Sequence, residues 1–136
     1  MTKEEALKFL LKHQPMPSDK DLTKDIIDRY DDVRKFFIQH PDSEAIKLFL
    51  RSFGDGDGWG VYQLVEDFFY QCPEPEVKRE IKKVLEDVNI SDGVRYWSTQ
   101  IAAAFNDEML RDGLEISLKS KNPDISDAAE IALGLL

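Results

Sequence analysis

The sequence predicts an all-α protein, a right-handed stack of antiparallel helix pairs with about eight helices in all. Three observations favour this class. Apolar residues recur three and four positions apart along nearly the whole chain, and no segment of useful length alternates with period two. The predicted connections hold only two to seven residues, which favours antiparallel neighbours. A chain of 136 residues corresponds to a single domain, 1–136.

The first two helices are expected to cap one end of this stack, within residues 1–41. Thr2 and Glu5 have the spacing of a capping box, and the helix that they begin continues to Lys12. The second helix carries apolar side chains at helical spacing from Leu22 onward and ends at the proline that follows His40.

Six further helices are predicted in residues 42–136, where they form three pairs. Ser91 and Asp107 are typical N-cap residues, and four glycines between residues 54 and 60 interrupt the helical pattern. The predicted spans are 42–53, 61–72, 77–88, 91–105, 107–118 and 125–136.

An internal repeat of about 32 residues supports this pairing. Apolar positions of the first helices superpose at offsets of 31 and 33, and those of the second helices superpose at 33 and 31. A two-helix unit that cannot bury its apolar face alone must pack on its neighbours. The matched positions are Ile46, Val77 and Leu110; Leu50, Ile81 and Leu114; Leu64, Trp97 and Ala128; and Phe68, Ile101 and Ala132.

The carboxyl-terminal segment adds a resemblance to a known group. Residues 122–136, with an acidic turn, paired alanines and a final Ala-Leu-Gly, resemble the second helix of short HEAT-like repeats. That resemblance implies a HEAT-like solenoid that binds protein through a curved helical surface. Small bacterial members of such families resemble immunity-type inhibitor proteins, which implies an inhibitory role.

Composition excludes several classes of function. The formal net charge of −9 repels a phosphate backbone, so we expect no direct binding of nucleic acid. The longest uninterrupted apolar run, residues 101–105, is far too short to cross a bilayer, and residues 1–13 lack the apolar core of a signal peptide. We therefore expect a cytoplasmic protein without membrane contact, in which Cys72 stays reduced.

The negative charge is unevenly distributed along the chain. Residues 1–53 contain 10 basic and 10 acidic side chains, whereas residues 54–136 contain 8 basic and 17 acidic ones. Such a field favours encounter with a basic protein. An ordinary solvated acidic surface would give the same imbalance.

The repeat predicts which side chains of the second helices face a partner. Acidic residues interspersed with tyrosine and arginine are typical of interface hot spots. For Tyr62, Tyr70 and Tyr96, packing in the core is an equal alternative. The predicted partner-binding residues are Trp59, Tyr62, Gln63, Glu66, Tyr70, Arg95, Tyr96, Thr99, Asp127 and Glu130.

The glycine-rich segment offers calcium binding as an alternative function. Asp55, Asp57, Gln63 and Glu66 occupy positions 1, 3, 9 and 12 of an EF-hand-like loop. Trp59 occupies position 5, where an oxygen ligand belongs. The acids could instead complement the dipole of the following helix.

Catalysis has little support in the sequence. His13 and His40 lie at helix ends ahead of prolines and share no metal-ligand spacing, and Cys72 occupies an apolar helix position. No acid pair stands out among 27 carboxylates. We expect no catalytic residues and no cofactor, and an enzyme with an unrecognised site remains a further alternative.

Overall fold

The computed structural model describes all residues, 1–136, and contains eight α-helices and no strand. The predicted all-α class is confirmed. None of these helices combines the length and the apolar character needed to span a bilayer. The α-helices are α1 (Lys3–Lys12), α2 (Lys24–Gln39), α3 (Glu44–Leu50), α4 (Glu66–Tyr70), α5 (Glu74–Leu85), α6 (Asp92–Ala104), α7 (Arg111–Leu118) and α8 (Pro123–Gly134), and the 3₁₀ helices are η1 (Gly58–Gly60), η2 (Tyr62–Val65) and η3 (Glu108–Leu110).

Side-chain caps begin four of the eight α-helices, α1, α2, α6 and α8, and the 3₁₀ helix η3. Thr2 accepts a hydrogen bond from the Glu5 amide at the start of α1, and Ser91 accepts one from Val94 at the start of α6. Asp107 is an N-cap as expected, although it begins η3 rather than a full α-helix. These side chains satisfy amides that would otherwise lack a partner in the first turn.

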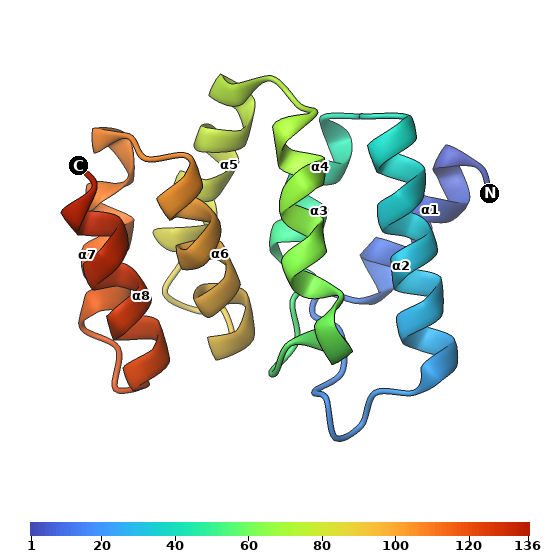
Figure 1. Ribbon diagram of the computed structural model, residues 1–136, viewed down its shortest axis with the longest axis horizontal. Helices are drawn as coiled ribbons and strands as arrows, with labels where there is room; N and C mark the ends of the chain where they lie inside the picture. The colour runs from blue at the N-terminus through green and yellow to red at the C-terminus, as the bar shows by residue number, and fades with distance from the viewer.

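The helices form two layers (Figure 1). The odd-numbered helices form the rear layer, in which α1 packs on α3, α3 on α5 and α5 on α7. The even-numbered helices face the viewer, with the amino terminus at the right and the carboxyl terminus at the left. In this front layer α2 packs against α4, and α6 packs against α8, but α4 and α6 do not pack closely against each other. The front layer is therefore divided in the middle.

Most of the matched apolar positions of the repeat are buried; Trp97 is half-buried, and Leu64 is exposed. All six positions in the first helices are at most 1 % exposed. Among the second helices, Leu64 is 41 % exposed, whereas Tyr62 and Val65 are buried. Residues 62–65 form a 3₁₀ helix, in which every third residue shares a face, so Tyr62 and Val65 point inward together. The α-helical spacing that predicts a buried Leu64 is therefore wrong here.

Candidate functional site: a groove between α4 and α6

The break in the front layer opens into two adjoining pockets. The upper pocket lies between α6 and the η2–α4 segment, and the lower pocket is bounded by the glycine-rich loop and the amino-terminal ends of α6 and α8. The lower pocket has a volume of about 550 Å³ and is lined by Asp55, Gly56, Asp57, Asp92, Gly93, Tyr96, Trp97, Asn122 and Asp124. The upper pocket has a volume of about 310 Å³ and is lined by Tyr62, Gln63, Glu66, Tyr96, Trp97, Gln100 and Ile101. Tyr96 and Trp97 belong to both pockets, which makes them one continuous groove, here called the central groove.

The glycine-rich loop that forms the lower wall is held in place by Asp19. The Asp19 carboxylate accepts hydrogen bonds from the amides of Asp57 and Gly58, each at 3.0 Å. The Asp19 amide donates to the carbonyl of Asp55 at 2.9 Å. Gly56 has a φ of 111°, a conformation that suits glycine, and a Cβ there would lie 2.2 Å from the Asp19 Cγ. The glycines therefore allow the loop to close around this carboxylate.

Helix α6 joins this loop through two hydrogen bonds. The Gly93 amide donates to the Asp55 carboxylate at 3.0 Å, and the Trp97 indole donates to the carbonyl of Gly56 at 2.9 Å. The Trp97 ring also meets the edge of Tyr62 at a centroid separation of 6.0 Å. Trp97 thus forms part of the groove wall. Its indole N–H is occupied by the hydrogen bond to Gly56, and the residue as a whole is half-buried.

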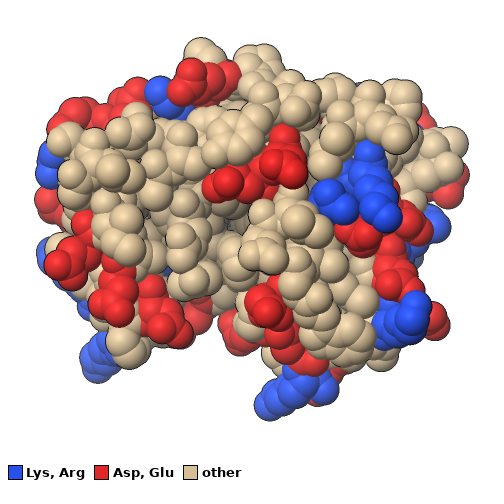
Figure 2. Space-filling view, viewed as in Figure 1, with Lys and Arg blue, Asp and Glu red and all other residues tan.

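The carboxylates of the central groove have no cationic partner within the chain. Asp55, Asp57, Glu66, Asp92 and Asp124 take part in none of the ion pairs of the structure, and no lysine or arginine lines either pocket. On this face basic side chains gather to the right, over α2, and the others lie along the left, upper left and lower edges (Figure 2). The groove therefore presents negative charge without ion pairs, and the buried Arg95, which interacts with the charge of Asp92, does not line it.

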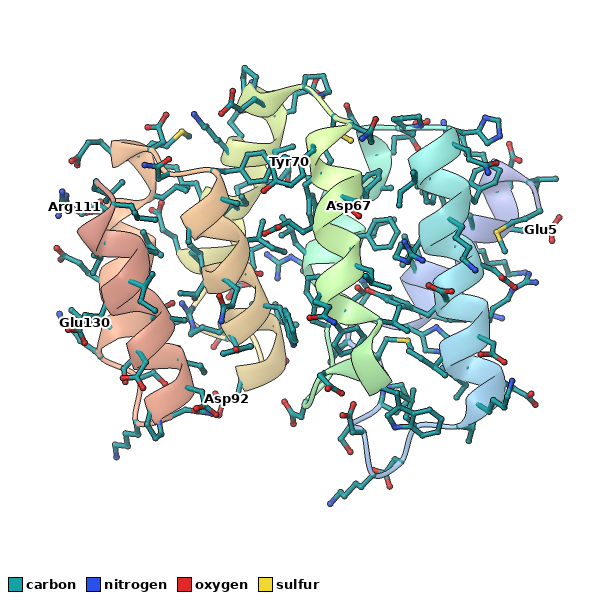
Figure 3. All side chains as sticks on the ribbon, viewed as in Figure 1. Glu5, Asp67, Tyr70, Asp92, Arg111 and Glu130 are labelled. Atoms are coloured by element: carbon teal, nitrogen blue, oxygen red, sulfur yellow. The ribbon has the colours of Figure 1, made fainter.

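Tyr70 marks the upper end of the groove. It points from α4 toward α6, with Asp67 lower on the same helix (Figure 3), and its ring stacks on Phe105 at a centroid separation of 5.2 Å. Its side chain remains 52 % exposed. Burial of part of the phenol, together with the nearby charge of Glu66, raises the pKa of Tyr70.

The structure brings together some of the predicted partner-binding residues and separates others. Gln63, Glu66 and Tyr96 meet in the central groove, and Tyr70 stands at its upper end. Trp59 is 51 % exposed on the loop but does not line the groove. Two more predicted residues, Asp127 and Glu130, are exposed on α8 beside a separate shallow depression.

Three of the predicted surface residues are buried, and the prediction that they face a partner is wrong. Tyr62, Arg95 and Thr99 are 1 %, 7 % and 0 % exposed. Tyr62 turns inward with η2, and its hydroxyl accepts a hydrogen bond from the Gly54 amide at 3.2 Å. Burial raises the pKa of Tyr62 to about 12.

Arg95 and Thr99 are buried because α6 is covered on two sides, by α5 and by the α7–α8 pair. The Arg95 guanidinium donates to the carbonyls of Leu85 and Asp87, at the end of α5, and to the Ser117 hydroxyl. The Thr99 hydroxyl donates to the carbonyl of Arg95 at 2.6 Å. Burial lowers the pKa of Arg95, against the charges of Asp87 and Asp92. This cation holds three helices together and does not face a partner.

The geometry does not support the calcium alternative. Asp55 and Asp57 line the lower pocket, whereas Gln63 and Glu66 line the upper one, so the four predicted ligands do not converge. No group of three or more His, Cys, Asp or Glu side chains is arranged to hold a metal ion. The loop directs two of its amides at the Asp19 carboxylate, and Asp55 accepts from α6.

Several residues that line or support the central groove were not predicted as binding residues. Asp19 lies 38 positions before Asp57 in the chain, and nothing in the local pattern links the two. Asp92 and Asp124 lie in the first turns of α6 and α8, where acidic residues are typical and indicate no binding site. Their position in the same pocket depends on how α6 and α8 pack. Gln100 could have been predicted from a local pattern, because it lies four residues after Tyr96 on the same face of the helix. It donates a hydrogen bond to the Tyr96 hydroxyl.

Other reactive groups lie away from the groove. Cys72 is buried, as predicted, and burial raises the pKa of its thiol to about 11, which leaves it a poor nucleophile at neutral pH. His13 forms a hydrogen bond through Nδ1 with the carbonyl of Phe9 at 2.8 Å, at the end of α1.

The chain matches no protein-family model, no curated protein and no solved structure.

Proposed function

We propose that this protein is a non-catalytic binding module that docks a basic protein in its central groove. In this proposal the helix pairs form a HEAT-like stack, and the groove is the place where the front layer of the stack opens. The arrangement of α1 to α8 in two layers supports the proposal, as does the uneven charge of the chain.

One observation carries the proposal. Five carboxylates line a groove that contains no lysine or arginine, and none of them has an ion pair. Outside the groove, 11 of the other 22 carboxylates have an ion pair, as where Asp31 lies 2.7 Å from Arg34 and 3.2 Å from Lys35. The like charges of the groove repel one another in the free protein, and a cationic partner would remove that cost.

The aromatic walls suit the same partner. Arginine and lysine side chains bind over the faces of tryptophan and tyrosine, at about 0.5–1 kcal/mol for exposed sites and more where water is excluded. Tyr96 and Trp97 meet edge to face at 5.1 Å and stand between the two sets of carboxylates. A guanidinium in the lower pocket would therefore contact carboxylate and ring together.

The functional consequence would be inhibition. A protein that binds an anionic substrate does so through a basic surface. Docking of that surface on the central groove would exclude the substrate, which is how an immunity-type inhibitor would act. The long-range field of the groove would accelerate the encounter, and this acceleration would fall as salt rises.

Two variants of equal net charge test the proposal. The groove variant carries D55N, D92N and D124N. The control variant carries D32N, D112N and E115Q, three exposed carboxylates that have no ion pair and line neither pocket. Binding of fluorescein-labelled deca-arginine is measured by anisotropy at about 0.15 M salt. We expect the groove variant to bind about tenfold more weakly and the control variant about twofold more weakly.

An equal loss in both variants would contradict the proposal, because it would reduce binding to overall charge. Circular dichroism and thermal unfolding verify that each variant is folded. Asparagine at position 55 keeps an oxygen that can accept from the Gly93 amide, so the junction with α6 is preserved. If the triple variant does not fold, D57N with D124N removes charge from the same pocket without touching that hydrogen bond.

A further inference from the structure

We infer that the central groove takes its basic partner as an extended segment of about four residues, with an arginine in the lower pocket and main-chain contacts to Gln63 and Gln100. This inference rests on the proposed function. It adds the conformation of the bound segment, its length and the residues that recognise its backbone.

The upper pocket limits what can pass through the groove. Its volume is about 310 Å³, against about 550 Å³ for the lower pocket. An α-helix with its side chains has a diameter of at least about 10 Å. An extended chain is narrower, because its successive side chains point to opposite sides. The smaller upper pocket therefore favours an extended segment.

The length of the groove follows from its α6 wall. The residues of α6 that line the two pockets run from Asp92 to Ile101. Over these nine steps an α-helix rises about 13.5 Å. An extended chain rises about 3.3 Å per residue, so about four residues span both pockets.

Gln63 and Gln100 provide the contacts that an extended backbone needs. They lie in the upper pocket on opposite walls, Gln63 from η2 and Gln100 from α6, and both are exposed. Gln100 donates to the Tyr96 hydroxyl at 2.8 Å, which leaves its amide oxygen free to accept. A side-chain amide both donates and accepts, and so matches the alternating N–H and C=O groups of an extended segment.

The charge gradient along the groove sets the place of the arginine. The lower pocket holds four aspartates, and the upper pocket holds one glutamate beside two glutamines. Tyr96 and Trp97 separate the two pockets, so a cation below and a neutral or apolar residue above both contact a ring. The bound segment therefore needs a cation at the end that enters the lower pocket.

NMR titration with acetylated, amidated tetra-arginine tests the inference on the ¹⁵N-labelled protein. We expect the side-chain amides of Gln63 and Gln100, the Trp97 indole and the Gly93 amide to shift together as one saturable event. Removing both glutamines, as Q63A with Q100A, should weaken binding about tenfold. The control, Q39A with Q71A, removes two exposed glutamines outside the groove and should change binding less than twofold.

Two further probes set the limits of the inference. A stapled helical peptide with the same four arginines should bind more weakly than tetra-arginine, and tetra-lysine should bind more weakly because it cannot form two parallel hydrogen bonds with a carboxylate. Tighter binding of the helical peptide, or equal binding by the Q63A/Q100A variant, overturns the inference. In either case, sensitivity of deca-arginine to the D55N/D92N/D124N variant would leave the proposed function standing, and loss of that sensitivity would overturn both.

Discussion

The two halves of the molecule are packed in different ways. From α1 to α4 the core is rich in aromatic rings, as where Phe49 lies 4.8 Å from Phe68 and 5.8 Å from Phe37, centroid to centroid. In α6 to α8 the buried side chains are mainly small or polar, among them Ala102, Ala129 and Ala132. Large rings separate the helices that they join, whereas small residues let helices approach closely.

The central groove lies where these two kinds of packing meet. Tyr62 belongs to the aromatic half, and its ring meets Trp97 of α6 at 6.0 Å. Trp97 thus fills the floor between α4 and α6 but leaves the space above it open to solvent. The groove thus coincides with a change of packing between neighbouring helix pairs. Five predictions test this difference, from the largest expected effect to the smallest.

The largest effect is expected in the aromatic half. Phe49→Ala removes a fully buried ring that contacts Tyr30, Phe37 and Phe68. Truncation of a buried phenylalanine costs about 3–5 kcal/mol in the free energy of unfolding, because rigid neighbours cannot fill the cavity. Urea unfolding monitored by circular dichroism measures this loss. A loss below about 1 kcal/mol would show that the rings repack easily and that the aromatic half is not rigid.

The junction of the two halves should be nearly as sensitive. In Gly93→Ala the new Cβ would lie 2.3 Å from the carbonyl oxygen of Gly54, a backbone atom that cannot move alone. We expect a loss of about 3 kcal/mol in the free energy of unfolding, because overpacking must displace the loop. Gly134→Ala is the matched control, since nothing lies within 4 Å of its new Cβ. Similar stability of the two variants would contradict a tight junction.

The polar core of the second half should depend on Arg95. Arg95→Met keeps much of the volume but leaves the Leu85 and Asp87 carbonyls and the Ser117 hydroxyl without this donor. We expect a loss of about 2 kcal/mol, because each buried polar group that loses its partner costs about 1 kcal/mol or more. Chemical denaturation measures it. An increase in stability would mean that the desolvation penalty of the buried guanidinium exceeds the stabilisation by its hydrogen bonds.

High pH should destabilise the fold through Tyr62. Its pKa is raised from 10.0 to about 12 because burial disfavours the phenolate. The unfolded chain therefore releases this proton at a lower pH than the folded protein does. The contribution of protonated Tyr62 to the free energy of unfolding is fully present below pH 10 and is lost as pH rises through 12. By pH 11.5 the loss from this group approaches about 2 kcal/mol. Tyr62→Phe should remove that part of the pH dependence, which is measured by urea unfolding at pH 9 and pH 11.5. An equal loss in the free energy of unfolding between these two pH values, in the variant and in the unaltered protein, would contradict the prediction.

The smallest effect is expected at Trp59. This residue has a φ of 52°, which is unfavourable for any residue with a Cβ, and its side chain is half exposed. Trp59→Gly should leave the free energy of unfolding unchanged or raise it by up to about 1 kcal/mol, in contrast to every buried aromatic residue. Thermal unfolding measures this. A loss of several degrees in Tm would show that the indole stabilises the loop through its contact with the carbonyl of Asp19.

Sequence patterns predicted the helices and caps well and the orientation of some side chains poorly. Helical spacing located all eight helices, with ends that differ by a few residues, as where α3 ends at Leu50 rather than residue 53. Thr2 and Ser91 cap as their local patterns indicate. The errors at Leu64 and Thr99 have separate causes, a 3₁₀ segment in one case and a helix covered on two sides in the other.

The candidate site could be predicted only in fragments. Gln63, Glu66 and Tyr96 were expected at a surface, and the structure places them in one groove. Their neighbours Asp92 and Asp124 begin different helices, and both patterns indicate no more than a first-turn acid. No local rule joins such residues, because the distance between two helix ends depends on packing.

The sequence by itself determined the helical class, the starts of most helices and the excess of negative charge, because caps, helical spacing and composition act over a few residues. Only the tertiary structure decided that Arg95 is buried while Gln100 is exposed, and that α4 and α6 part to leave a groove without cations. Burial and clefts depend on the volumes of side chains that meet across helices, and those meetings involve residues far apart in the chain.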